Sequence, residues 1–132
     1  LVLRRHGGML YIGLPSGREL AYMRPRIEEE GITYEGVEQT TRKWQRLATW
    51  GGKLTENIVQ AVARDCLAEA MLRLDQAGYR TVMHVHDEVV LEAPRGEHTP
   101  EEVAELMGRP IPWAPGLPLR ADAYQCDYYR KD

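Results

Sequence analysis

The chain has 132 residues, enough for one domain with a hydrophobic core. Apolar residues make up 43% and charged residues 28%, as in ordinary globular proteins. From this length we expect one domain over residues 1–132. No apolar run reaches the eighteen residues of a membrane span, so we expect no membrane partner. The net charge of −3 argues against nucleic acid, whose binders usually carry a basic excess, unless the charge is unevenly distributed.

The ends and the cysteines bear on where the protein works. The sequence starts with Leu1 rather than Met and has no signal-peptide layout, so we interpret it as starting inside a longer polypeptide. Cys66 and Cys126 are far apart and form no Cys-x-x-Cys pair. The cysteine pattern favours a reduced, cytoplasmic location.

The first third of the chain has the pattern of short strands. Residues 9–14 are apolar and β-prone, residues 15–17 form a turn signal, and residues 19–23 resume extended character, which predicts a β-hairpin. Residues 32–35 predict a third short strand. Residues 40–50 mix cationic and aromatic side chains, and we expect them to be irregular or partly helical.

The longest periodic segment runs from Lys53 to about Ala77. Its residues are strong helix formers, and Gly78 is a natural C-terminal stop. Apolar side chains occupy much of the helix circumference, so we expect a largely buried helix. They are Leu54, Ile58, Val59, Val62, Ala63, Cys66, Ala70 and Leu74.

One face of this helix is polar. Lys53, Asn57, Gln60 and Arg64 recur at i, i+4, i+7 and i+11, which places them on the same side. All four side chains can donate hydrogen bonds, and two are cationic. The ordinary interpretation is a solvated face. The functional alternative is a row of donors directed at a polyanion or at base edges.

The second strong pattern predicts a hairpin. Residues 81–85 and 89–92 read as two apolar strands, with His86, Asp87 and Glu88 between them. Carboxylates are costly to bury unpaired, so at a hairpin tip they face solvent or a ligand. Mg²⁺ prefers such oxygens and typically takes one or two of them together with substrate phosphates. A plain acidic surface turn is the simpler alternative.

Zinc offers a rival interpretation of the same hairpin. His84 and His86 are two apart on a strand and so point to the same side, and with Asp87 they could bind zinc. A zinc hydrolase would need a further ligand, and His6 and His98 are distant in sequence.

The C-terminal part predicts one more helix and one more strand. Thr99 is a suitable N-cap and Pro100 a suitable first residue for a short helix that ends near Met107. Residues 117–124 predict a final strand. Together these elements indicate an α+β fold, an antiparallel sheet with its hairpin packed on one long helix and a short helix.

The ordered motifs are similar to the C-terminal part of family A DNA polymerases, especially the bacteriophage and prophage branch. The resemblance covers nearly the whole chain and rests on order and spacing. The matching stretches are Leu14-Pro15-Ser16-Gly17-Arg18 with Leu20 and Tyr22, Trp50-Gly51-Gly52-Lys53-Leu54, Glu56-Asn57-Ile58-Val59-Gln60-Ala61, Ala63-Arg64-Asp65, Val85-His86-Asp87-Glu88-Val89-Val90 and Trp113-Ala114-Pro115-Gly116-Leu117-Pro118-Leu119.

The resemblance implies a role for the hairpin in a two-metal Mg²⁺ site. Asp87 is expected to be the second of the two catalytic aspartates, and Glu88 its less essential acidic neighbour in metal binding. His86 is expected near the primer terminus. Nucleotidyl transfer at such a site adds the nucleotide of a deoxynucleoside triphosphate to the primer of primer–template DNA, with the metals activating the 3′-hydroxyl and stabilising the leaving pyrophosphate.

The resemblance also implies that the helix contacts DNA. Gln60 is expected to touch the minor groove of the primer–template, where acceptors at every base pair allow pairing to be monitored without reading sequence. Asn57 and Lys53 are expected to assist, with Arg64 in the same donor row.

The chain departs from the family in what it lacks. It has no counterpart of the first catalytic aspartate, the fingers helix or the thumb, so we expect a C-terminal palm segment that is inactive in isolation. Two alternatives stay open. One is a catalytically silent binding module that self-associates through exposed sheet surface. The other is the zinc-dependent hydrolase.

Overall fold

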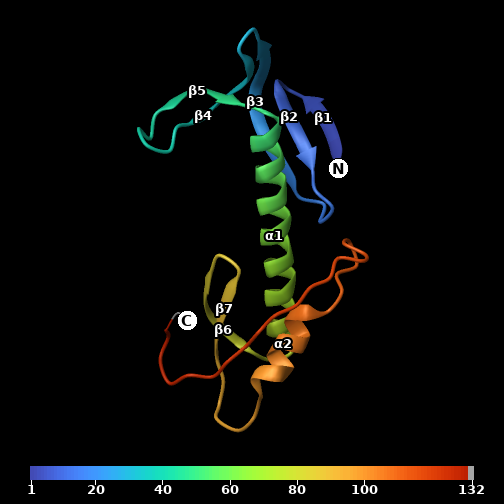
Figure 1. Cartoon of the computed structure of the whole chain (residues 1–132), viewed down its shortest axis with the longest axis vertical. Coiled ribbons are helices and arrows are strands. Elements are labelled where there is room, and N and C mark those ends of the chain that lie inside the picture. Colours follow the sequence, from blue (N-terminus) through green and yellow to red (C-terminus); the bar gives the residue numbers. More distant parts are fainter. Residues whose placement is uncertain (131–132) are drawn as a thin grey trace. The chain divides into compact units, whose positions relative to one another are not determined.

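The computed structural model describes residues 1–130, which form two compact units. The first comprises residues 1–62 and the second begins at residue 63, within the long helix α1 (Gly51–Gln76). A five-stranded antiparallel sheet, a two-stranded sheet and two helices make up the regular structure of the described residues, which confirms the α+β class (Figure 1).

The N-terminal unit is built on an antiparallel meander. Its strands follow one another in the sheet in chain order, each paired with the next. The predicted hairpin and third strand are confirmed as β2, β3 and β4. The bounds are β1 (Val2–His6), β2 (Met9–Gly13), β3 (Glu19–Glu28), β4 (Gly31–Val37) and β5 (Trp44–Thr49).

The core of the N-terminal unit lies on one face of this meander. Ile12 pairs with Leu20 across β2 and β3, and alternation places both on the same face as Tyr22. Ile12 and Tyr22 are buried. The ring of Tyr34, on β4, meets the ring of Tyr22 edge-on with centroids 5.0 Å apart. Such an arrangement adds about 0.5–1.5 kcal/mol beyond area burial.

Two strands of the sheet were not predicted. The expectation of irregular or helical structure for residues 40–50 is wrong, because β5 pairs with β4 from Trp44 to Thr49. Its pattern is alternating: Leu47 and buried Thr49 face the core, while Arg46 lies on the other face. Sheet pairing therefore outweighs the weak local propensity of this mixed segment. β1 was also missed, since all of its residues are exposed.

Helix α1 confirms the predicted long helix and its stop. Gly78 adopts a φ of 88°, and the amide of Tyr79 donates to the carbonyl of Leu74 at 2.9 Å, as in glycine-terminated helices. The helix is not largely buried, however. Val59 is 60% exposed and Leu72 59%, because no other described element covers those sides. Within residues 1–130, no helix is both long and apolar enough to cross a membrane.

The C-terminal unit contains the second half of α1, the predicted hairpin and the predicted short helix. The hairpin strands are β6 (Arg80–Val85) and β7 (Glu88–Glu92), and the helix is α2 (Pro100–Gly108). Thr99 and Glu102 form a reciprocal capping box at its start. The core residues of this unit are Leu67, Ala70, Leu74, Tyr79 and Ile111.

A further correction concerns residues 117–124, which form no strand. Pro118 has no backbone N–H to donate to a ladder, and both sheets of the described residues contain only strands from earlier in the chain. The segment instead runs as irregular chain from α2 to the described end at Arg130.

Candidate functional site

His86, Asp87 and Glu88, the site residues that the sequence predicts in the hairpin, lie at a tight turn in the C-terminal unit. Val85 pairs with Glu88, so His86 and Asp87 alone form the two-residue loop. His86 has a φ of 53°, in the left-handed region that two-residue hairpin loops require at their first position. A two-residue loop between paired strands has little backbone freedom, so the backbone of Asp87 is held at the tip of the hairpin.

The two carboxylates of the trio have different surroundings. Asp87 is exposed, and within residues 1–130 its carboxylate has no hydrogen-bond or ion-pair partner. Glu88, the first residue of β7, is half-buried and lies near the phenol of Tyr129, whose pKa its charge helps to raise. Asp87 is therefore the more exposed of the two carboxylates and the one whose oxygens are more available to a cation.

Tyr129 is a member of this site that the sequence did not reveal. Partial burial, followed by the nearby charge of Glu88 and the hydrogen bond to it, raises the pKa of the Tyr129 phenol. An ion pair between Arg95 and Asp127 also ties this C-terminal segment to the chain that follows β7. The tail has no periodicity, so no local pattern signals that it returns to the hairpin.

Arg64, one of the predicted donors, reaches the hairpin from α1. Its Nη1 lies 3.3 Å from Nδ1 of His84. Because a guanidinium only donates, Nδ1 of His84 accepts and carries no proton in this contact. A positive charge in this position disfavours a second cation at His84, which counts against the zinc interpretation. His84 is also exposed.

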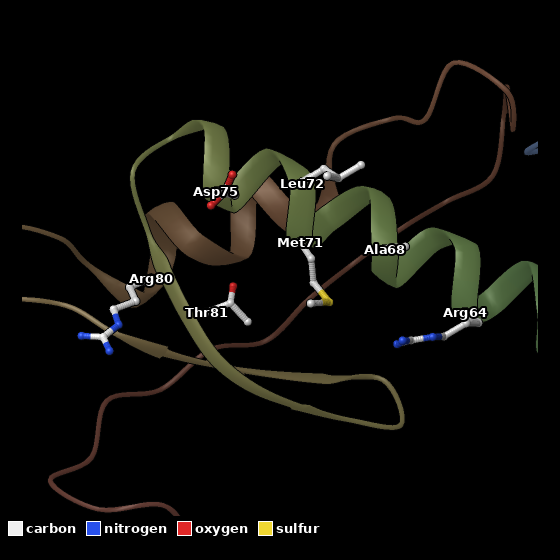
Figure 2. A pocket seen from close by; sticks show the side chains of 7 residues that line it. All are labelled: Arg64, Ala68, Met71, Leu72, Asp75, Arg80 and Thr81. Atoms are coloured by element: carbon white, nitrogen blue, oxygen red, sulfur yellow. The ribbon is translucent and has the colours of Figure 1, made fainter.

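A groove of about 510 Å³ separates the second half of α1 from β6 (Figure 2). Met71 and Thr81 point toward each other across it, and Arg64 lies on the same side of the helix. The hydroxyl oxygen of Thr81 is buried without a hydrogen-bond partner among the described residues. The groove therefore brings together apolar side chains, the cations Arg64 and Arg80 and the carboxylate of Asp75.

The other three predicted donors belong to the N-terminal unit. Lys53 forms an exposed ion pair with Glu56 at 3.0 Å. Asn57 donates from Nδ2 to the hydroxyl of Tyr22 at 3.0 Å. Gln60 is exposed and has no side-chain partner within residues 1–130. Of the three, Gln60 has the side chain most available to a ligand.

The hairpin carboxylates do not form a complete metal site. Among residues 1–130, no three His, Cys, Asp or Glu side chains gather in a group that could hold an ion. Mg²⁺ can complete its shell with water and substrate phosphate, so an exposed carboxylate such as that of Asp87 suits it as one ligand of several.

Comparison with known proteins points to one kind of enzyme. No protein-family model matches the chain, and no solved structure matches it. A DNA polymerase of Bacillus phage SP02 is 57% identical to it over 131 residues, in a match that covers 95% of this chain. The chain spans 20% of the length of that polymerase. It is thus similar to one segment of a phage DNA polymerase along nearly all of its own length.

Proposed function

We propose that this chain is the C-terminal palm segment of a DNA-directed DNA polymerase of family A. The observation that carries the proposal is the free carboxylate of Asp87, fixed at the tip of a two-residue turn in a chain 57% identical to part of a phage DNA polymerase. The fold supports this role, because β6 and β7 hold the turn by paired strands rather than by a loose loop. A cytoplasmic location accords with such an enzyme.

The hairpin would bind Mg²⁺ through Asp87 as one ligand of a two-metal site. Such ions activate a 3′-hydroxyl and stabilise a departing pyrophosphate. Glu88 stands beside this position, with the phenol of Tyr129 near its carboxylate. His86, exposed next to Asp87, would contact the primer terminus.

Helix α1 would supply contacts to primer–template DNA. Gln60 is exposed and can donate to the minor-groove acceptors present at every base pair. Lys53 can leave its ion pair with Glu56 and contact a phosphate, because exposed ion pairs add little to stability. Asn57 and Arg64 would assist while keeping their contacts to Tyr22 and His84.

The chain by itself would not polymerise DNA. One aspartate cannot hold two ions and a triphosphate, and the first catalytic aspartate of the family has no counterpart in residues 1–132. Primer extension with Mg²⁺, deoxynucleoside triphosphates and the chain alone tests this point. Robust synthesis would disprove it.

The role of Asp87 can be tested in a chimera. The matched segment of the Bacillus phage polymerase is replaced by this chain, and primer extension is measured with and without Asp87→Asn. We expect a loss of about 10³-fold in kcat, as when a transition-state stabiliser is removed, and a much smaller loss for Glu88→Gln. Glu97→Gln removes an exposed carboxylate from the irregular segment after β7 and is the matched control. Equal rates for Asp87→Asn and Glu97→Gln would refute the metal role.

A catalytically silent interaction module is the second candidate. The observation that favours it is the exposure of Leu72, Val82 and Met83 on α1 and β6, which leaves apolar surface on the C-terminal unit. Sedimentation of the chain at increasing concentration distinguishes the candidates. Self-association that Val82→Lys abolishes, together with an Asp87→Asn chimera of full activity, would favour the interaction module.

A further inference from the structure

The loop between β4 and β5 presents an aromatic ring beside two cations. Trp44 is 57% exposed, and its cross-strand partner Val37 is 52% exposed. Arg42 and Lys43 immediately precede it, and neither side chain has a partner among the described residues. We call residues 37–44 the basic tip. The basic tip therefore exposes a large aromatic side chain to water next to two cationic residues without ion-pair partners within residues 1–130.

The basic tip is held in one conformation by its own hydrogen bonds. The amide of Glu38 donates to the carbonyl of Lys43 at 2.9 Å, and the amide of Arg42 donates to the carbonyl of Glu38 at 2.9 Å. The carboxylate of Glu38 accepts from the amide of Thr41 at 2.6 Å. Backbone hydrogen bonds from Thr41 and Thr40 lower the pKa of Glu38. Its negative charge is therefore bound to the loop backbone rather than directed outward with the cations.

The charge of the N-terminal unit is arranged along β4. The turn at the other end of this strand carries Glu28, Glu29 and Glu30. A seven-residue strand separates the two ends by about 20 Å, more than two Debye lengths at physiological salt. The basic tip therefore acts on a ligand independently of the acidic turn.

The two units also differ in net charge. Residues 1–62 contain nine Lys and Arg against seven Asp and Glu, whereas residues 63–132 contain eight against thirteen. The overall charge of −3 thus conceals a basic N-terminal unit. A polyanion would be attracted to the N-terminal unit and repelled by the other.

We infer that the basic tip binds single-stranded DNA, with a base stacked on Trp44 and phosphates contacted by Arg42 and Lys43. An aromatic platform flanked by cations is the chemistry by which proteins hold single strands without reading sequence. Duplex DNA fits less well, since its bases are already stacked and offer no free face. The choice of DNA as the nucleic acid rests on the proposed function, but the contact itself requires neither Asp87 nor a metal ion.

Fluorescence anisotropy of the full chain with a labelled 12-nucleotide single strand, in EDTA, tests the inference. We expect Trp44→Ala to weaken binding about 5- to 150-fold, the range for loss of one stacked base. Arg42→Ala with Lys43→Ala should lower the slope of log affinity against log salt by about 1.4, from two lost phosphate contacts. Asp87→Asn should leave binding unchanged, which separates this surface from the metal site.

Matched controls lie at the other end of β4. Ile27 is 89% exposed and Arg26 has no side-chain partner among residues 1–130, so Ile27→Ala and Arg26→Ala remove the same kinds of group beside the acidic turn. Losses equal to those at the basic tip would overturn the inference, as would equal affinity for a blunt duplex. Sedimentation of each variant is the last check. A dimer of the wild type that Trp44→Ala dissociates would assign the tip to protein association instead, and would also overturn it.

Discussion

The side-chain amide of Asn57 on α1 donates to the hydroxyl of Tyr22 on β3 across 3.0 Å, joining helix and sheet inside the N-terminal unit. Tyr22 is only 7% exposed, so this hydroxyl has little access to water as a substitute partner. A residue that the sequence placed in a row of DNA-directed donors thus has a structural contact of its own.

Asn57→Ala should therefore lower the free energy of unfolding by about 1–2 kcal/mol, because it leaves a buried hydroxyl unsatisfied. Urea denaturation of the chain measures the change. The double variant with Tyr22→Phe should be less destabilised than the sum of the singles, with a coupling of about 0.5–1.5 kcal/mol. Gln60→Ala, on the same helix but exposed, should change stability by less than about 0.5 kcal/mol. Equal losses at positions 57 and 60 would contradict a structural role specific to Asn57.

The elements with strong periodicity were predictable from sequence, and those defined by long-range pairing were not. Helix α1 and the hairpin β6–β7 have clear patterns and clear stops, such as Gly78. The short helix α2 was predicted from its N-cap, Thr99, and from Pro100 as its first residue. Strand β5 was missed because its pairing with β4 cannot be read from a mixed local pattern. The strand expected over residues 117–124 was wrong, since β propensity without a pairing partner produces no strand.

The candidate site divides in the same way. Asp87 and its turn follow from local rules, because acids between apolar strands belong at an exposed tip. Tyr129 could not be predicted, since its contact with Glu88 spans some forty residues of chain without regular structure on the tyrosine side. The sequence also could not predict that Asn57 has a hydrogen-bond partner and Gln60 has none among residues 1–130. Helical spacing shows that the two residues share a face, but not which side chains have partners.

The two cysteines should differ in reactivity. Cys126 is exposed, whereas burial, followed by the neighbouring Asp65 charge, raises the pKa of the Cys66 thiol. The thiolate is the reactive form, and each unit of increase in pKa cuts its fraction about tenfold. With an aromatic disulfide reagent at neutral pH we expect one fast and one slow thiol. Cys126→Ser should remove the fast phase only. A fast phase that persists in this variant would show that Cys66 is accessible.

The C-terminal unit should lose stability at alkaline pH through two tyrosines. Burial is the main cause that raises the pKa values of Tyr79 and Tyr129. The charge of Glu102 raises the pKa of Tyr79 further, and the charge of Glu88 does the same for Tyr129. A raised folded-state pKa favours the neutral phenol. The stabilisation is therefore complete below the ordinary value of about 10 and is lost as pH rises through the folded-state values.

Urea denaturation between pH 8 and pH 11 measures this loss. The double variant with Tyr79→Phe and Tyr129→Phe keeps both rings but cannot ionise at these positions, so its stability should decline less steeply above pH 10. Tyr128→Phe, at an exposed neighbour, serves as the control. Parallel declines in the double variant and the wild type would exclude these two phenols as the cause.

The left-handed turn residue His86 gives the sharpest test of the hairpin. A φ of 53° costs a residue with a side chain about 1–2 kcal/mol, a cost that glycine avoids. Glycine also makes the unfolded chain more flexible, which offsets part of the gain. We therefore expect His86→Gly to leave the free energy of unfolding unchanged or to raise it by up to about 1 kcal/mol.

The control is His84→Gly, two residues away in β6. It should lower the free energy of unfolding by about 0.5–1 kcal/mol, because glycine weakens strands. Denaturation of both variants under identical conditions decides the point: an equal loss at both positions would mean that the turn imposes no strain on His86. If His86→Gly also slows primer extension in the chimera without destabilising the fold, the imidazole is retained at a strained position for its contact with the primer rather than for stability.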